Sequence, residues 1–275
     1  MTNDCAVDRR TFLAGAAASV AAMALNSSPG AAVNGPQNGD CVFLTNEDSN
    51  TLTVIDPVSN TVKATVNLTS FDEDPRPPFR FVTGGMTPTH GAMVQKPLYH
   101  GAISIHGCVP SPDSTLLATA GQGTSNLYLI DTRTLKVIGN QPNSQAGPTT
   151  NAETLTSGIL VGREPHEPTL TRTGREIWVA IRGEDKIAVV DVEKAKAESA
   201  GVAPRGSSLR RFIPVLPGPA MVWFSADGLT ALIISQKTPR IDVFDVSYDA
   251  RGYSTERARQ RSTFQRRINL ASARF

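Results

Sequence analysis

The chain has 275 residues, of which 40% are hydrophobic and 6% aromatic, with 22 Gly and 19 Pro. This composition can fill a hydrophobic core, excludes global disorder, and favours many short strands joined by tight turns. The net charge is +2, but residues 251–275 hold seven Arg and one Glu and contribute +6, so residues 1–250 carry a net charge of −4. Nucleic-acid binding is therefore not expected, since it needs a basic face against phosphates.

Residues 1–32 resemble a twin-arginine signal peptide, and the resemblance is carried by Arg9, Arg10, Phe12 and Leu13. An apolar run at 14–25 and small residues at 30–32 follow, as signal peptidase requires. The run is shorter than the ~20 residues that cross a bilayer, so a cleaved signal is favoured over an uncleaved anchor. We expect export through the twin-arginine machinery to the periplasm or medium, with no stable membrane span after cleavage.

The remaining chain is a repeat anchored on four aspartates. Each ends an apolar run, and the four runs align without gaps: 52–56, 127–131, 187–191 and 241–245. Eighteen residues before each aspartate stands the first residue of a turn dipeptide: 38–39, 113–114, 173–174 and 227–228. A second apolar run lies between turn and aspartate: 41–45, 116–119, 177–181 and 231–234. Each unit thus predicts a strand, a tight turn, a strand, a loop and a strand, and the recurring aspartates are expected to serve turns.

Repeated antiparallel units of this kind are typical of propeller blades, with a solenoid as the alternative. The segment Ser111-Pro112-Asp113-Ser114, with 116–119 and 127–131, resembles the YVTN-type β-propeller repeat, as does the segment from 171 to 191. That family's unit runs Ser-Pro-Asp-Gly, Tyr-Val-Thr-Asn and Val-Ile-Asp. The resemblance covers roughly 39–249. It implies an all-β propeller of four-stranded antiparallel blades, four to five of them present, and no particular activity.

The expected organisation has three parts: a signal at 1–32, blades at 33–249, and an Arg-rich solvated tail at 250–275. The blades carry insertions at 71–105 and 139–157, expected after the last strand of one blade and around the mouth of the central channel. Because the resemblance implies seven or eight blades, we expect a truncated or frame-altered version of a longer propeller. A short variant that closes by self-association is the alternative. An unclosed propeller would expose two sheet faces.

Candidate chemistry gathers where two innermost strands enter the channel. His106 and His166 both lie 25 residues before their aspartates, where the other units have Ala31 and Ala220. The candidate cofactor ligands are His106 and His166, and the candidate metal ligands are His90, His100, His106, His166, Glu164 and Glu167. Imidazole suits both metal binding and proton transfer. A haem or a divalent metal is open as the cofactor, with a fold-level resemblance to haem-binding propellers of denitrification. The structural alternative is that these histidines only bond neighbouring blades.

Two cysteines, Cys41 and Cys108, remain beyond the signal. A periplasmic disulfide and ordinary buried thiols are both open.

The leading functional hypothesis is a periplasmic propeller that binds an unidentified small ligand or protein without catalysis of its own. One alternative is a cofactor protein or a lactonase-like hydrolase that uses the channel histidines. Another is a fragment without independent function. Convergence of His106, His166 and an acidic residue such as Glu164 or Glu167 would favour the enzyme or cofactor hypothesis.

Overall fold

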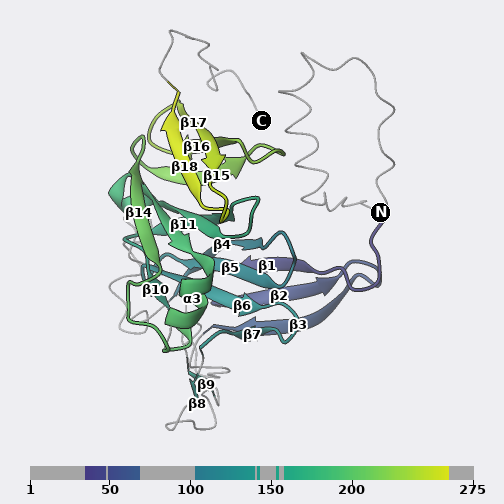
Figure 1. Cartoon of the computed structure of the whole chain (residues 1–275). Coiled ribbons are helices and arrows are strands. Elements are labelled where there is room, and N and C mark those ends of the chain that lie inside the picture. Colours follow the sequence, from purple (N-terminus) through teal and green to yellow (C-terminus); the bar gives the residue numbers. More distant parts are fainter. Residues whose placement is uncertain are drawn as a thin grey trace. The chain divides into compact units, whose positions relative to one another are not determined.

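The computed structural model describes residues 35–47, 49–68, 103–139, 141–142, 153–154 and 158–259. Within them the chain forms four antiparallel blades of a β-propeller and one further two-stranded sheet, which confirms the predicted all-β class (Figure 1). The predicted signal and most of the insertion at 71–105 lie outside the described residues. No helix in the described part is long and apolar enough to cross a membrane.

Each sheet is one blade, numbered in chain order. Blade 1 holds β1 (Val42–Asn46), β2 (Thr51–Asp56) and β3 (Thr61–Asn67). Blade 2 holds β4 (Ile105–Pro110), β5 (Leu116–Gly121), β6 (Asn126–Asp131), β7 (Lys136–Val137) and β10 (Ile159–Leu160). Blade 3 holds β11 (Pro165–Leu170), β12 (Glu176–Ile181), β13 (Lys186–Asp191) and β14 (Leu209–Pro214), with η3 (Arg182–Glu184) and α3 (Val192–Ser199) between strands. Blade 4 holds β15 (Pro219–Phe224), β16 (Thr230–Ser235), β17 (Ile241–Tyr248) and β18 (Ser254–Ala258). The short strands β8 (Gln141–Pro142) and β9 (Glu153–Thr154) pair with each other.

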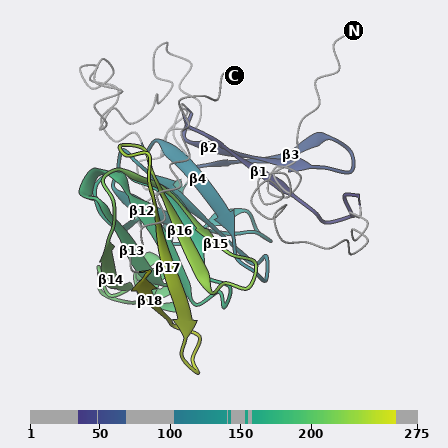
Figure 2. The same ribbon diagram turned by 90° about the horizontal axis from the view of Figure 1, so that it is seen from above.

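The innermost strands of blades 2 to 4 are β4, β11 and β15, and β11 contacts both of the others. Figure 2 shows β4 and β15 toward the middle of the view, with β3 and β14 at its outer edges. This arrangement gathers the first residues of the innermost strands, where the sequence places His106 and His166.

Strand alternation gives each blade two apolar faces, and the core lies between successive blades. One cluster joins blades 1 and 2: Leu52, Val54, Leu117, Tyr128 and Ile130 are among its members. A second joins blades 2 and 3: Leu127, Leu129, Ile177, Val179 and Val190 are among its members. A third joins blades 3 and 4: Trp178, Ile187, Val189, Ile233 and Phe244 are among its members.

The predicted tight turns are present in all four units. The second residue of each turn dipeptide has a positive φ: Gly39 (95°), Ser114 (59°), Gly174 (70°) and Gly228 (73°). Such values favour glycine and short polar residues, which is what the sequence supplies.

In the first three units the anchor aspartate accepts hydrogen bonds from backbone N–H groups that follow its strand. Asp56 and Asp131 accept hydrogen bonds from the backbone N–H groups of the second and third residues that follow them. These bonds stabilise the ionised carboxylates and lower the pKa of both residues. Asp191 caps α3 by accepting from the Lys194 N–H at 2.9 Å. Asp245 differs, because it lies inside β17 and pairs with Arg259 at 2.7 Å.

The expected blade boundary at residue 249 is corrected. Strand β18 pairs with β17 along its whole length, so the blade continues to Ala258. The repeat predicts the end of the strand at Asp245, but β17 continues for three more residues to Tyr248. The turn lies at Asp249, which accepts hydrogen bonds from the Arg251 and Tyr253 N–H groups. The start of the Arg-rich segment is therefore part of the fold, and residues 260–275 lie outside the described residues.

The insertion at 139–157 was expected beyond the outer strand of blade 2, but it interrupts that strand. Both β7 and β10 pair with β6, at opposite ends of it. Because β7 has only two residues, β10 supplies the rest of the outer ladder after the insertion. This insertion therefore leaves the blade at the edge far from β4 and not at the channel mouth.

Cys41 and Cys108 do not pair. The Cys108 thiol is buried and donates to the Phe43 carbonyl oxygen at 3.8 Å, whereas Cys41 is partly exposed beside the Lys63 ammonium at 3.5 Å.

Candidate functional site

The three innermost strands begin in the same irregular way. Each has a register shift near its first residues, so that β4, β11 and β15 bulge where they enter the channel. Just before each bulge stands a residue with positive φ: Ser104 (53°), Glu164 (57°) and Gly218 (71°). Bulges redirect side chains and are common at rims and beside active sites. In blades 2 and 3 the redirected side chains are His106 and His166.

The two imidazoles meet. The ring centroids of His106 and His166 are 4.0 Å apart, with the rings tilted by 60°. Gly107 permits this approach of β4 to β11, because a Cβ there would stand 2.9 Å from Glu167 Cγ and 3.0 Å from the His166 carbonyl oxygen.

Blade 1 contributes a carboxylate to the pair. Glu47 Oε2 lies 3.6 Å from His106 Nδ1, and Glu47 Oε1 accepts from the Ser104 hydroxyl at 2.8 Å. The carboxylate is thus held between two residues of blade 2. At 3.6 Å the two atoms are further apart than in a hydrogen bond. A carboxylate that closed on Nδ1 would orient the ring and leave Nε2 for another partner, as in a histidine base.

Sequence reasoning missed four residues that surround the histidines. They stand nine residues before the anchor aspartates, in the connections that lead into the aspartate-bearing strands β2, β6, β13 and β17: Glu47, Gln122, Arg182 and Gln236. A signal for them existed, since this column of the repeat is a large polar side chain in every unit. We call these four residues the polar ring.

Arg182 connects three other members of the site. Its Nε donates to Glu164 Oε2 at 3.3 Å, Nη1 to Gln236 Oε1 at 3.4 Å, and Nη2 to Gln122 Oε1 at 3.1 Å. One guanidinium therefore ties together side chains from blades 2, 3 and 4, in the multidentate manner that favours arginine over lysine.

The hydrogen-bond network fixes the tautomer of His166. Gln236 Oε1 accepts from Arg182, so the Gln236 amide NH₂ donates to His166 Nε2, 3.4 Å away. The neutral ring then carries its proton on Nδ1. That nitrogen is buried near the Ala220 backbone but makes no well-formed hydrogen bond within the described residues.

His166 is neutral at physiological pH. Burial lowers its pKa from 6.5 to about 3, aided by positive charge from His106 and Arg182. Only 7% of the residue is exposed, against 36% of the His106 side chain. The site therefore has an accessible end at Glu47 and His106 and a buried end at His166, Glu164 and Arg182.

The structure brings together only part of the predicted ligand set. Glu164 is turned to Arg182, while the Glu167 side chain lies against Gly107. His90 and His100 lie outside the described residues. Among the described residues no three His, Cys, Asp or Glu side chains are grouped to hold a metal ion. The acidic side chain that lies beside His106 is that of Glu47.

The histidine pair does not fit a haem iron as its two axial ligands. Such ligands stand on opposite faces of the porphyrin plane, whereas these rings touch each other.

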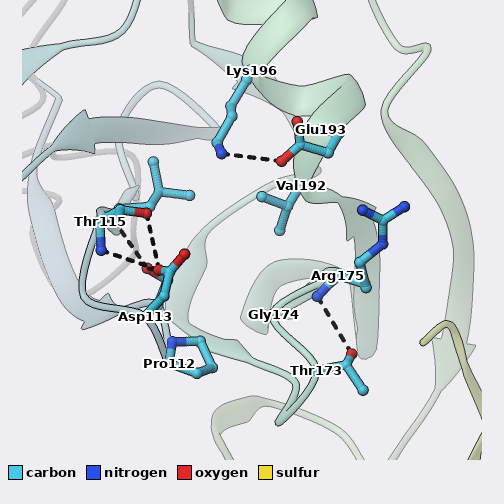
Figure 3. A pocket seen from close by; sticks show the side chains of 11 residues that line it. Pro112, Asp113, Thr115, Thr173, Gly174, Arg175, Val192, Glu193 and Lys196 are labelled. Carbon is cyan, nitrogen blue, oxygen red and sulfur yellow. Dashed lines mark hydrogen bonds and ion pairs between the residues drawn. The ribbon is translucent and has the colours of Figure 1, made fainter. Parts of the chain in front are cut away.

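A separate pocket of about 220 Å³ lies at the other end of the blade 2 and blade 3 strands (Figure 3). Its lining includes Asp113, Arg175, Glu193 and Lys196, from two hairpin turns and α3. Asp113 is bound to Thr115 and Lys196 to Glu193, as Figure 3 shows. The Arg175 guanidinium donates instead to the Tyr253 hydroxyl at 3.4 Å, and none of the polar ring lines the pocket.

No family model matches the chain, and no curated protein matches it. Similar folds occur among solved structures. A putative 6-phosphogluconolactonase from Bacteroides uniformis is 13% identical with a TM-score of 0.47, over 80% of this chain and 54% of that one. The periplasmic gluconolactonase of Pseudomonas aeruginosa is 15% identical with a TM-score of 0.45, over 82% and 55%. Hydrazine synthase of Kuenenia stuttgartiensis is 21% identical with a TM-score of 0.40, over 56% and 35%. The chain thus spans about half the length, or less, of these proteins, and the likeness concerns the fold alone.

Proposed function

We propose that this chain is an exported β-propeller protein that binds a small polar ligand at the accessible end of the histidine site. The observation that supports it is the convergence of His106 and His166 with a polar ring drawn from all four blades. The site offers imidazole, carboxamide and carboxylate groups within one cluster. A ligand rich in hydroxyl and carboxylate groups, such as a sugar acid, matches this mixture of donors and acceptors.

Export is part of the proposal and rests on the residues of the signal alone. The twin arginines Arg9 and Arg10 stand before an apolar run, and residues 1–32 would leave with the signal. A protein ligand bound through the insertions stays a prediction, because most of the insertion residues lie outside the described residues.

NMR spectroscopy of the imidazole groups tests ligand binding directly. Adding gluconate should shift the ring signals of His106 and His166. In the His106→Ala variant, gluconate should no longer shift the His166 signal. Lys196→Ala, in the separate pocket, is the matched control and should leave the shifts unchanged. Unchanged imidazole signals with gluconate and with glucono-δ-lactone would count against the proposed ligand class.

A second function is favoured by one specific contact, that of Glu47 with His106 Nδ1. It would allow His106 Nε2 to take a proton from water as the water attacks a lactone carbonyl. The same nitrogen would return that proton to the ring oxygen as the C–O bond breaks, which gives the hydroxy acid. Glucono-δ-lactone hydrolysis should then exceed the uncatalysed rate and fall by about 10²–10⁴-fold in His106→Ala, the usual contribution of a positioned base. An equal rate with and without protein would leave the binding function alone.

A further inference from the structure

The outward face of blade 4 is apolar, and none of the described elements packs on it. The register of its strands sets two rows across the sheet on the side away from blade 3: Met221, Ile234 and Ile241 in one, and Trp223, Leu232 and Val243 in the other. The alternate residues Val222, Ala231 and Ile233 pack against blade 3. Large apolar side chains on an open sheet face are a marker of an interaction surface.

Repeat positions identify what kind of surface this is. Leu232, Ile234, Ile241 and Val243 occupy the positions that Trp178, Ala180, Ile187 and Val189 occupy in blade 3. Those four blade 3 residues are fully buried in the contact with blade 4. The open face of blade 4 is therefore the face that packs on a following blade.

Blade 1 has the complementary open face. Val42, Leu44 and Ile55 occupy the positions of Ile177, Val179 and Val190, which are fully buried in blade 3 against blade 2. The open face of blade 1 is thus the one that packs on a preceding blade. Val42, Leu44, Leu232, Ile234 and Ile241 are all between 37% and 48% exposed, so the two faces do not cover each other within one copy.

We propose that two copies of this chain associate, with blade 4 of each packing on blade 1 of the other, to form a closed ring of eight blades. At each junction the open face of blade 4 in one copy meets the open face of blade 1 in the other. The same two kinds of face meet in the three contacts between blades within the chain. Propellers of four to eight blades are known, and a head-to-tail contact closes when its rotation completes the ring. This inference does not depend on the proposed ligand.

Light scattering after size-exclusion chromatography measures the association. The chain should elute at twice the mass of one copy. Leu232→Glu and Leu44→Glu each place a charge in both junctions and should give monomers. Val202→Glu is the matched control, because Val202 is 82% exposed on blade 3, away from both faces, and this variant should stay dimeric. Circular dichroism of each variant separates lost association from lost folding.

Mixing two variants tests the head-to-tail geometry. A Leu44→Glu chain mixed with a Leu232→Lys chain regains one unaltered junction and gains opposite charges at the other, so dimers should return. A monomeric parent chain, a polydisperse assembly, or dimers insensitive to Leu44→Glu and Leu232→Glu would overturn the proposal. A folded mixture that stays monomeric would overturn it as well.

Discussion

His166 is a buried histidine that folding keeps neutral, and this links the stability of the protein to pH. Its pKa is about 3 in the folded chain and near 6.5 when the chain unfolds. The stabilisation is fully present above pH 6.5 and is lost as the pH falls toward 3, since the unfolded chain then binds a proton that the folded chain excludes. One such proton changes the free energy of unfolding by about 1.4 kcal/mol per pH unit.

Replacing His166 with Gln should remove this contribution. Urea unfolding between pH 7 and pH 4 should show a shallower loss of stability in His166→Gln than in the parent chain. Equal slopes for the two proteins would contradict a buried neutral His166.

Gly107 controls the approach of the two histidines. A methyl group there meets backbone atoms of β11 within about 3 Å, namely the Glu167 Cα and the His166 carbonyl oxygen at 3.0 Å. Gly107→Ala should therefore separate β4 from β11 and cost about 1–3 kcal/mol, as overpacking does. Chemical denaturation gives the cost, and the imidazole NMR signals should shift as the rings part. Gly35→Ala, in open space, is the control. An unshifted pair of signals would show that the strands need not move.

At this scale the sequence predicted the histidines but not their partners. The alignment gave His106 and His166 equivalent positions because their spacing from the anchor aspartates is identical. The polar column of the repeat contains Glu47, but its contact with His106 joins residues of different blades. Only the packing of blade 1 on blade 2 sets such a contact, which the spacing within a repeat does not reveal.

At the scale of elements, a buried carboxylate joins blade 3 to the last strand of blade 4. Glu176 on β12 is fully buried, and Oε1 accepts from Arg210 Nε at 2.9 Å and Arg211 Nη1 at 3.3 Å. Its Oε2 accepts from the Ser254 N–H at 2.8 Å and from the Ser254 hydroxyl. Ser254 begins β18, so this network holds the strand that the sequence did not predict.

Glu176→Ala removes the buried carboxylate that pairs with Arg210 and Arg211. It should destabilise the fold by about 3–5 kcal/mol, the usual cost of breaking a buried ion pair. Urea unfolding measures the loss. Glu193→Ala removes the exposed partner of Lys196 and should change stability by about 1 kcal/mol or less. Similar losses in the two variants would contradict the role given to Glu176.

The strand pattern of the blades was predictable because period-two apolar runs and turn dipeptides are local signals. Three elements were not predicted from them. The helix α3 follows Asp191 where a strand would continue the repeat, and Val192 and Ala195 bury one side of it. Strand β18 is rich in polar residues, so alternation does not mark it. Strand β10 belongs to blade 2 only through pairing across the insertion.

For the molecule as a whole, the export prediction can be tested independently of the fold. Replacing both Arg9 and Arg10 with Lys should keep the protein in the cytoplasm, because the twin-arginine pathway requires the arginine pair. Fractionation of cells followed by immunoblotting measures the periplasmic share. Periplasmic protein at the parent level in the Lys variant would contradict the assigned signal.

Ligand binding by this exported propeller is expected to depend on the His106 and His166 cluster. Isothermal titration calorimetry with gluconate tests it most directly, on the parent chain and on His106→Ala, with Lys196→Ala as control. We expect saturable binding that weakens by about tenfold or more in His106→Ala, as for a lost hydrogen bond to a charged group, and that is unchanged in Lys196→Ala. Equal binding by the parent and His106→Ala, or no heat of binding from the folded parent chain, would contradict it.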